Sequence, residues 1–94
     1  MRIIGGIAKG KNLFSPPETT RPTSDRAREG LFSSLESEFG SMSDLNFLDL
    51  YSGSGAVGVE ALSRGASKVV SVERHQPTAL IGEKNFELVK GAEG

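Results

Sequence analysis

The stretch Asp49-Leu50-Tyr51-Ser52-Gly53-Ser54-Gly55-Ala56-Val57-Gly58 decides the fold that we expect for this chain of 94 residues. Its glycines have the spacing G-x-G-x-x-G. They follow an apolar run at residues 45–51, which is typical of a buried strand, and precede a predicted helix over residues 56–64. The next predicted strand, residues 68–73, ends in Glu73, 20 residues after Gly53. This combination indicates a nucleotide-binding turn at the carboxyl edge of a parallel sheet.

Two further helices flank this unit. One is predicted to begin near Ser24 or Asp25, either of which can cap it, and to end at Gly40. Its apolar stripe comprises Ala27, Leu31, Leu35 and Phe39, with Phe32 beside them. The last helix is predicted over residues 77–90, and Gly91 would close it. Strands that alternate with helices predict a Rossmann-like α/β fold with parallel strands.

The N-terminal part of the chain has a different pattern. Residues 2–4 and 11–14 are expected to form a β-hairpin around a glycine-rich turn, and three prolines predict a loop at residues 15–23. We therefore divide the chain into a basic hairpin and loop, residues 1–23, and one incomplete Rossmann-like domain, residues 24–94.

Charge is distributed unevenly along the chain. Residues 1–28 hold six basic and two acidic residues, a net charge of +4, whereas residues 29–94 hold five basic and ten acidic residues, a net charge of −5. A basic segment ahead of an acidic domain indicates a polyanionic partner. The alternative is a solvated N-terminus without a partner, because six basic residues make a small electrostatic footprint.

The composition excludes several classes of site. The chain has no cysteine, so disulfides, thiolate metal sites and cysteine nucleophiles are absent. The single histidine, His75, has no neighbour that suggests a metal site, and we expect none. No apolar run approaches the roughly 18 residues that cross a bilayer, and the N-terminal apolar stretch is too short for a signal peptide. A cytoplasmic protein is expected.

Two classes of cofactor fit the glycine turn, and Asp49 bears on the choice between them. A dinucleotide places its pyrophosphate at the helix N-terminus, where backbone amides attract negative charge. A carboxylate about 5 Å from a phosphate would cost on the order of 3 kcal/mol at an effective dielectric of 20. S-adenosylmethionine offers an ammonium there instead, which Asp49 can bind directly or through water. Three alternatives stay open: glycines that only make a tight turn, an Asp49 bonded only to the turn, and a Glu73 that is only a surface acid.

Four segments resemble a known family. LDLYSGSGAVGVEALSRGA, residues 48–66, resembles the first cofactor motif of class I methyltransferases, in the D-x-F-x-G-x-G form, with Tyr51 where Phe is usual. MRIIGGIAKGKNL, TRPTSDRAREGLF and ASKVVSVE resemble segments of the bacterial RsmD-type methyltransferases, which methylate the N2 amine of one guanine in 16S ribosomal RNA. The resemblance covers nearly residues 1–80, and TRPTSDRAREGLF makes it specific to the family.

This resemblance implies S-adenosylmethionine as the cofactor, 16S rRNA or the small ribosomal subunit as the partner, and a role for each matching residue. The residues that would surround the methionine part of the cofactor are Asp49, Tyr51, Ser52, Gly53, Ser54 and Gly55. Glu73 would hold the ribose, and Arg74 and His75 would lie near the adenine. The loop that would close over the cofactor contains Arg21, Thr23 and Ser24. The residues that would bind RNA are Arg2, Lys9, Lys11 and Arg21.

Simpler interpretations stand beside these roles. Arg26 and Arg28 are interpreted as exposed charges of the first helix. Thr23 and Ser24 can act as helix caps, a role that is compatible with cofactor contact. His75 is interpreted as a loop residue.

The sequence lacks one motif that the resemblance calls for. Relatives that methylate such amines have Asp or Asn followed by Pro-Pro and an aromatic residue, which orient the amine for attack. None of Pro16, Pro17, Pro22 and Pro77 follows Asp or Asn. We therefore expect the N-terminal half of a longer enzyme, without catalytic residues of its own and inactive alone. The unpaired sheet edge of such a half favours a homodimer.

Two other functions remain as alternatives. An NAD-dependent oxidoreductase domain is supported by the glycine spacing and Glu73 alone. A non-catalytic RNA-binding fragment is supported by the basic N-terminal segment and the missing motif.

Overall fold

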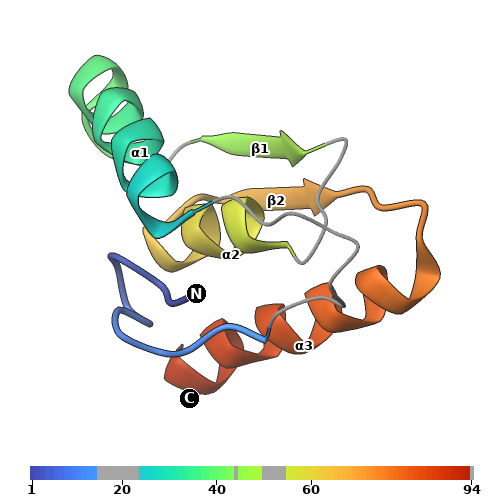
Figure 1. Ribbon diagram of the computed structural model, residues 1–94. Coiled ribbons are helices and arrows are strands. Elements are labelled where there is room, and N and C mark those ends of the chain that lie inside the picture. The colour runs from blue at the N-terminus through green and yellow to red at the C-terminus, as the bar shows by residue number, and fades with distance from the viewer. Residues whose placement is uncertain (15–23, 44, 50–54, 94) are drawn as a thin grey trace.

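The computed structural model describes residues 1–14, 24–43, 45–49 and 55–93. Its elements, in chain order, are α1 (Asp25–Phe39), β1 (Asn46–Asp49), α2 (Ala56–Ser63), β2 (Lys68–Ser71) and α3 (Gln76–Glu93). Figure 1 shows the two strands side by side, with α2 packed beneath them and α3 beyond α2. The predicted order of helices and strands is confirmed.

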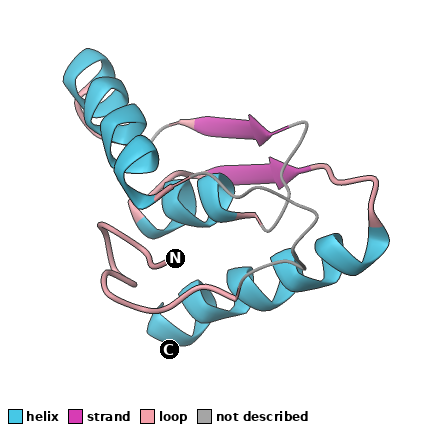
Figure 2. Ribbon diagram, in the orientation of Figure 1, coloured by secondary structure: helices cyan, strands magenta, loops and turns pink. Residues whose placement is uncertain are grey.

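The sheet is a parallel pair. Asn46 lies opposite Lys68, and Asp49 lies opposite Ser71. Because side chains alternate along a strand, Phe47 and Val69 face the core. On the other face the side chains of Leu48, Val70 and Val72 are exposed. The strands alternate with helices as the sequence predicts, which confirms the Rossmann-like α/β arrangement (Figure 2).

α2 lies at the centre of the packing because its side chains are small and it has a core cluster on each side. One cluster joins α2 and α3 to the N-terminal segment, and its buried members are Ile3, Ala8, Leu13, Ala56, Val59 and Val89. The other joins α2 to α1 and the sheet, and its buried members are Phe32, Met42, Ala61 and Ala66. Phe32 also stacks on Phe47 with ring centroids 5.6 Å apart. α2, the helix that follows the glycine turn, therefore packs against both the sheet and the N-terminal segment.

The N-terminal segment, residues 1–14, which we call the arm, has the path of a hairpin but little strand. Its one β-bridge joins Arg2 to Asn12 in the antiparallel sense. The strands predicted at residues 2–4 and 11–14 are thus reduced to single residues. Between these two segments Gly6, with φ of 81°, turns the chain in the left-handed region.

The predicted apolar stripe of the first helix is confirmed only in part: Phe32 and Leu35 pack in the core, but the rest of the stripe is exposed. Leu31 and Phe39 are 42% and 56% exposed, whereas the fully buried residues of α1 are Arg28 and Phe32. The inward face is therefore rotated by one residue from the expected one. The physical reason for this rotation is an ion pair, because Arg28 points inward to the buried carboxylate of Glu60 on α2. The interpretation of Arg28 as an exposed charge is wrong for the same reason.

The remaining differences concern element ends. α3 begins at Gln76 and continues to Glu93, so the prediction that Gly91 closes it is wrong. A glycine costs a helix only about 1 kcal/mol relative to alanine, which does not oblige the helix to end. β2 ends at Ser71 rather than at residue 73. No helix within the described ranges combines the length and the apolar character that crossing a membrane requires.

Candidate functional site

The parallel register brings two predicted acids to one edge of the sheet. Asp49 ends β1, and its carbonyl oxygen accepts a hydrogen bond of 2.8 Å from the N–H of Val72. Glu73 follows immediately after Val72, so it leaves the sheet at the same edge as Asp49. The structure thus places both carboxylates where the sequence predicts a cofactor site.

Gly55 faces this edge as the first residue before α2. Its backbone is left-handed, with φ of 80° and ψ of 8°, and its carbonyl accepts the first helical bond, from Val59, at 2.8 Å. A Cβ at this position would lie 3.3 Å from the Phe86 ring and 3.4 Å from the Cα of Gly82. Only glycine can adopt this left-handed backbone and also leave room for Phe86 and Gly82, since other residues rarely adopt a positive φ.

Gly58 has a different function in the motif. A Cβ there would lie 2.7 Å from the Ser71 hydroxyl oxygen and 3.0 Å from Val69. The missing side chain therefore lets α2 approach β2 closely, which is the packing role of the third glycine in this motif.

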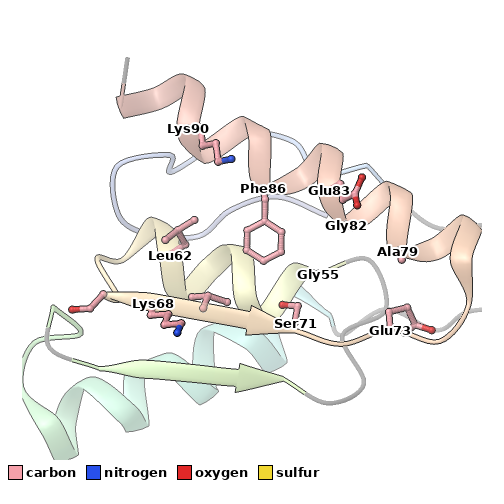
Figure 3. A pocket seen from close by; sticks show the side chains of 12 residues that line it. Gly55, Leu62, Lys68, Ser71, Glu73, Ala79, Gly82, Glu83, Phe86 and Lys90 are labelled. Atoms are coloured by element: carbon pink, nitrogen blue, oxygen red, sulfur yellow. The ribbon is translucent and has the colours of Figure 1, made fainter.

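A pocket of about 470 Å³ opens between β2 and α3 and includes Gly55 and Glu73 in its wall. Figure 3 shows Phe86 pointing from α3 toward β2, with Ser71 and Glu73 toward one end of the pocket and Lys68 toward the other. Its wall combines apolar side chains with Lys68 of β2, with Glu73 just after β2, and with Glu83 and Lys90 of α3. Asp49 is not part of this wall, so the pocket covers only the Glu73 side of the predicted site.

Ser71 is a polar group that the sequence did not single out. Its hydroxyl oxygen is buried in the wall of the pocket and has no hydrogen-bond partner in the described part of the chain. A buried polar atom without a partner is costly, so such an atom in a pocket wall is a ready contact for a polar ligand.

The turn after β2 is held by Glu73 itself. Its Oε2 accepts a hydrogen bond of 2.8 Å from the N–H of His75. The His75 ring contacts the buried Thr78 hydroxyl through Nδ1 at 2.7 Å, and the His75 carbonyl accepts the first bond of α3, from Ala79. His75 thus caps α3 from the turn, and the neighbouring Arg74 is exposed. The Glu73 side chain is positioned by this turn as well as by β2.

Ser24 caps α1, as one of its two predicted roles requires. Its hydroxyl oxygen accepts a hydrogen bond of 3.0 Å from the N–H of Ala27. Its contact with a cofactor stays a prediction. The other predicted cofactor residues lie outside the described residues, and they are Arg21, Thr23, Tyr51, Ser52, Gly53 and Ser54.

The predicted RNA-binding residues of the arm divide into two kinds. Arg2 and Lys9 are exposed and line one hollow of about 320 Å³ together with Glu29 of α1. Lys11 is only partly exposed, and its Nζ donates a hydrogen bond of 3.0 Å to the carbonyl of Leu88 on α3. The exposure of Arg2 and Lys9 is consistent with a surface function, whereas Lys11 connects the arm to α3 by a hydrogen bond. Arg21, the fourth, lies outside the described residues.

Sequence reasoning also missed the acid at the centre of α2, Glu60, which is fully buried. A signal for it was present, because Glu60 is a single acid in a short helix of otherwise small and apolar side chains. Such an acid needs a partner, since a buried charge is stable only when it is paired or hydrogen-bonded.

Comparison with known proteins supports these motifs along the whole chain. A family model described as "Conserved hypothetical protein 95" matches residues 1–93. The ribosomal RNA small subunit methyltransferase D of Escherichia coli K12 is 40% identical over 91 residues, which are 96% of this chain and 44% of that protein. The protein of the same name from Haemophilus influenzae is 38% identical over 91 residues, 96% of this chain and 46% of its own length.

Solved structures give the same result. A hypothetical protein of Thermus thermophilus superposes with a TM-score of 0.84 at 36% identity, covering 96% of this chain and 50% of that one. The chain spans about half the length of the curated relatives that it matches. The match over residues 1–93 shows that the chain belongs to the family described as conserved hypothetical protein 95, the family of RsmD-type methyltransferases that its motifs resemble.

Proposed function

We propose that this protein is the cofactor-binding part of an S-adenosylmethionine-dependent methyltransferase that acts on a guanine N2 amine of 16S ribosomal RNA. Relatives of the same family carry the name ribosomal RNA small subunit methyltransferase D, which supports the reaction and the substrate. The proposal includes a cytoplasmic location, which the composition predicts.

The observation that carries this proposal is the shared edge of Asp49, Gly55 and Glu73. Two acids leave neighbouring parallel strands at this edge, and a left-handed glycine opens the helix between them. Acids on both strand ends suit a ligand with an ammonium and two ribose hydroxyls, whereas a diphosphate at the same place would meet Asp49. The residues present therefore fit S-adenosylmethionine better than a dinucleotide.

Each residue would then have a separate task. Asp49 would bind the ammonium of the methionine part, and Glu73 would accept hydrogen bonds from the ribose hydroxyls. Gly55 would let the ligand approach the start of α2, and the buried Ser71 hydroxyl would donate to a polar atom of the nucleoside. Arg74 would lie near the adenine. The bound cofactor supplies the methyl group on its sulfonium, and these residues hold and orient it.

Further cofactor contacts are proposed at residues outside the described ranges. Those of the glycine turn are Tyr51, Ser52, Gly53 and Ser54, and those of the loop before α1 are Arg21 and Thr23, with Ser24 at the helix cap. The amine-orienting motif has no counterpart in the 94 residues. We therefore propose binding by this chain without methyl transfer.

Calorimetry with S-adenosylhomocysteine and NAD tests the cofactor. Heat is expected with S-adenosylhomocysteine, and heat with NAD alone would overturn the assignment in favour of an oxidoreductase domain. Glu73→Gln should weaken the binding of S-adenosylhomocysteine, because a ribose acceptor loses its charge. Glu83→Gln is the matched control, since Glu83 lies in the same pocket wall on α3 but away from the strand ends. Equal loss in both variants would speak against a specific role of Glu73.

A second candidate, RNA binding without cofactor, is favoured by the exposed Arg2 and Lys9. A salt titration measures it, because phosphate contacts weaken steeply as salt rises. RNA binding by a variant that has lost all binding of S-adenosylhomocysteine would support this reading of the chain.

The predicted homodimer also remains a proposal. Its support is the sheet, which has two strands in the described part of the chain and exposes Leu48 at 63% and Val70 at 42%. Sedimentation equilibrium measures it. A monomer at high protein concentration would rule it out.

A further inference from the structure

Glu60 binds the backbone of the arm directly. Its carboxylate lies in the middle of α2 and is fully buried. Oε1 accepts a hydrogen bond of 2.9 Å from the N–H of Ile4, and Oε2 accepts one of 2.9 Å from the N–H of Gly5. Charged acceptors make stronger hydrogen bonds than neutral ones, so one side chain fixes two consecutive amides of the arm.

Two arginines complete the surroundings of this carboxylate. The Nε of Arg28 on α1 lies 3.4 Å from Oε1, and the Nε of Arg64 lies 2.8 Å from Oε2. Arg28 also donates to the carbonyl of Arg2 and to Asp25. The acid therefore joins three parts of the molecule that are far apart in sequence: the arm, α1 and α2.

Two other buried polar side chains hold the rest of the arm. The Ser63 hydroxyl donates to the carbonyl of Gly5 at 2.7 Å and accepts from the N–H of Ala8 at 3.0 Å. Asn85 of α3 bonds both the N–H and the carbonyl of Phe14, at 2.7 and 3.1 Å. Because these bonds engage the backbone, the arm is fixed in place while the side chains of Arg2 and Lys9 stay exposed.

The fixed arm brings two of these cations to one place. Arg2 and Lys9 lie seven residues apart in sequence but line the same hollow against α1. Neither side chain forms an ion pair within the described ranges. Glu29, across the hollow, is the one acid in its wall among the described residues.

We propose that Glu60 is a positioning residue for RNA: by holding the backbone of the arm, it presents Arg2 and Lys9 as a preorganised pair of cations to the phosphates of the RNA backbone. This inference rests on the proposed function, which supplies the RNA. A preorganised pair loses less conformational entropy on binding than the same cations on a loose segment. Glu60 itself touches no RNA, and its effect passes through the position of the arm.

The test measures binding of a short 16S rRNA hairpin to the full 94-residue chain at several salt concentrations. Glu60→Gln should raise the Kd about tenfold and flatten the salt dependence by about one to two phosphate contacts, although every cation of the arm is still present. Glu87→Gln, an exposed acid on α3, is the matched control and should leave both quantities unchanged.

A double-mutant cycle separates positioning from general stability. In the background Arg2→Ala/Lys9→Ala, Glu60→Gln should have almost no further effect on the Kd, because the cations that it positions are gone. An undiminished loss in that background would show a merely structural role. Glu29→Gln should tighten binding, because an acid that repels phosphate is removed from the hollow.

A second variant is designed to release the arm from its position while leaving Glu60 intact. A Cβ on Gly6 would lie 1.8 Å from the carbonyl oxygen of Ser63, whereas a Cβ on Gly40, at the C-cap of α1 and outside the hollow, meets nothing within 4 Å. Both glycines have positive φ, 81° and 79°, so Gly6→Ala and Gly40→Ala bear similar backbone strain and differ in the clash. Gly6→Ala should weaken RNA binding as Glu60→Gln does, and Gly40→Ala should not.

Hydrogen exchange reports whether the arm is released. The amides of Ile4 and Gly5 should lose protection in Glu60→Gln and Gly6→Ala while those of β2 keep it. A released arm with unchanged RNA affinity would overturn the positioning role and leave the proposed function intact. A wild-type chain that binds no RNA would overturn both.

Discussion

The arm and the glycine edge, which is the sheet edge at Asp49 and Glu73 together with Gly55 and Gly58 of the glycine motif, both contact α2, but by opposite means. At the glycine edge the contact depends on the absence of a side chain, because Gly58 lets β2 come within van der Waals distance of the helix. At the arm it adds a charged side chain, Glu60, which reaches out to the backbone amides of Ile4 and Gly5. One helix of eight residues thus positions two neighbouring segments, one through absent atoms and one through an ionised group.

The difference shows in how each contact tolerates change. A tight packing contact fails when atoms are added, whereas a buried ionic contact fails when one partner is removed and the other charge is left in the core. The contact made by Glu60 is therefore expected to be sensitive to deletion of atoms, and the contact at Gly58 to their addition. The following variants test this contrast.

Glu60→Ala should have the largest effect on stability. Arg28 and Arg64 would lose their shared buried partner, and the amides of Ile4 and Gly5 would lose their acceptor. Removing one member of a buried ion pair costs about 3–5 kcal/mol, a large share of the roughly 5–15 kcal/mol that stabilises a domain. Urea unfolding followed by circular dichroism measures the loss.

Glu87→Ala is the control for that variant, because Glu87 is exposed and its ion pair with Lys90 lies on the surface. Its effect should stay within about 0.5 kcal/mol. A loss below about 1 kcal/mol in Glu60→Ala would mean that Ser63 and Asn85 hold the arm without it.

Gly58→Ala should reduce stability by about 1–3 kcal/mol, because the added methyl group overpacks the contact between α2 and β2. The new Cβ would lie 2.7 Å from the Ser71 oxygen and 3.1 Å from the Phe86 ring. Gly30→Ala, in the interior of α1, meets no atom within 4 Å and should instead stabilise by about 0.5–1 kcal/mol. Thermal unfolding of both variants gives the two signs, and a stabilised Gly58→Ala would contradict the packing argument.

The sequence predicted the glycine edge better than the arm, and the reason is physical. Gly55, Gly58 and Glu73 have roles set by local backbone geometry and spacing, which a motif encodes directly. Arg64 is a local partner of Glu60, four residues away, but the other three partners are residues 4, 5 and 28, which are 32 to 56 positions away. Such pairing depends on the tertiary fold, and no local pattern reveals it.

The first helix shows the cost of judging burial by hydrophobicity alone. The stripe through Leu31 and Phe39 was predicted to face inward, but the buried face holds Arg28 beside Phe32. Hydrophobic periodicity treats an arginine as an outward residue, and it fails when a buried acid on another helix accepts that charge. A single acid in an apolar helix is a sequence signal that a partner is needed, although it does not say which cation supplies it.

Asp49→Ala tests the glycine edge as a binding site. If Asp49 binds the cofactor ammonium, as proposed, the variant should weaken the binding of S-adenosylhomocysteine by about 1–3 kcal/mol, roughly 5-fold to 150-fold in Kd. Asp49→Asn, which keeps the shape of the side chain but not its charge, should have an affinity between that of the wild type and that of Asp49→Ala. Calorimetry measures the affinities, and an unchanged Kd for Asp49→Ala with intact folding would leave Asp49 a structural residue.

The smallest expected effect concerns the outer end of the arm network. Desolvation raises the pKa of Asp25, but hydrogen bonds from the Arg28 guanidinium and the Arg2 N–H outweigh it, so the pKa lies below its ordinary value of 3.8. A lowered carboxyl pKa stabilises the fold above pH 3.8, and that stability is lost as the pH falls through the lower folded value.

Asp25→Asn should therefore reduce stability near neutral pH by less than about 1 kcal/mol, because the side chain of Asp25 is 39% exposed and solvent screens the pair. The difference from wild type should shrink from neutral pH to a pH well below 3.8, where more of the wild-type carboxyl is protonated. Ser24→Ala is the matched control: it removes the neighbouring helix cap, a neutral hydroxyl, so its loss of about 1 kcal/mol should be the same at both pH values. Urea unfolding at the two pH values distinguishes these patterns. A deficit in Asp25→Asn that persists in acid would show that Asp25 acts through its hydrogen bonds rather than its charge, and the ionic part of the network would then end at Arg28.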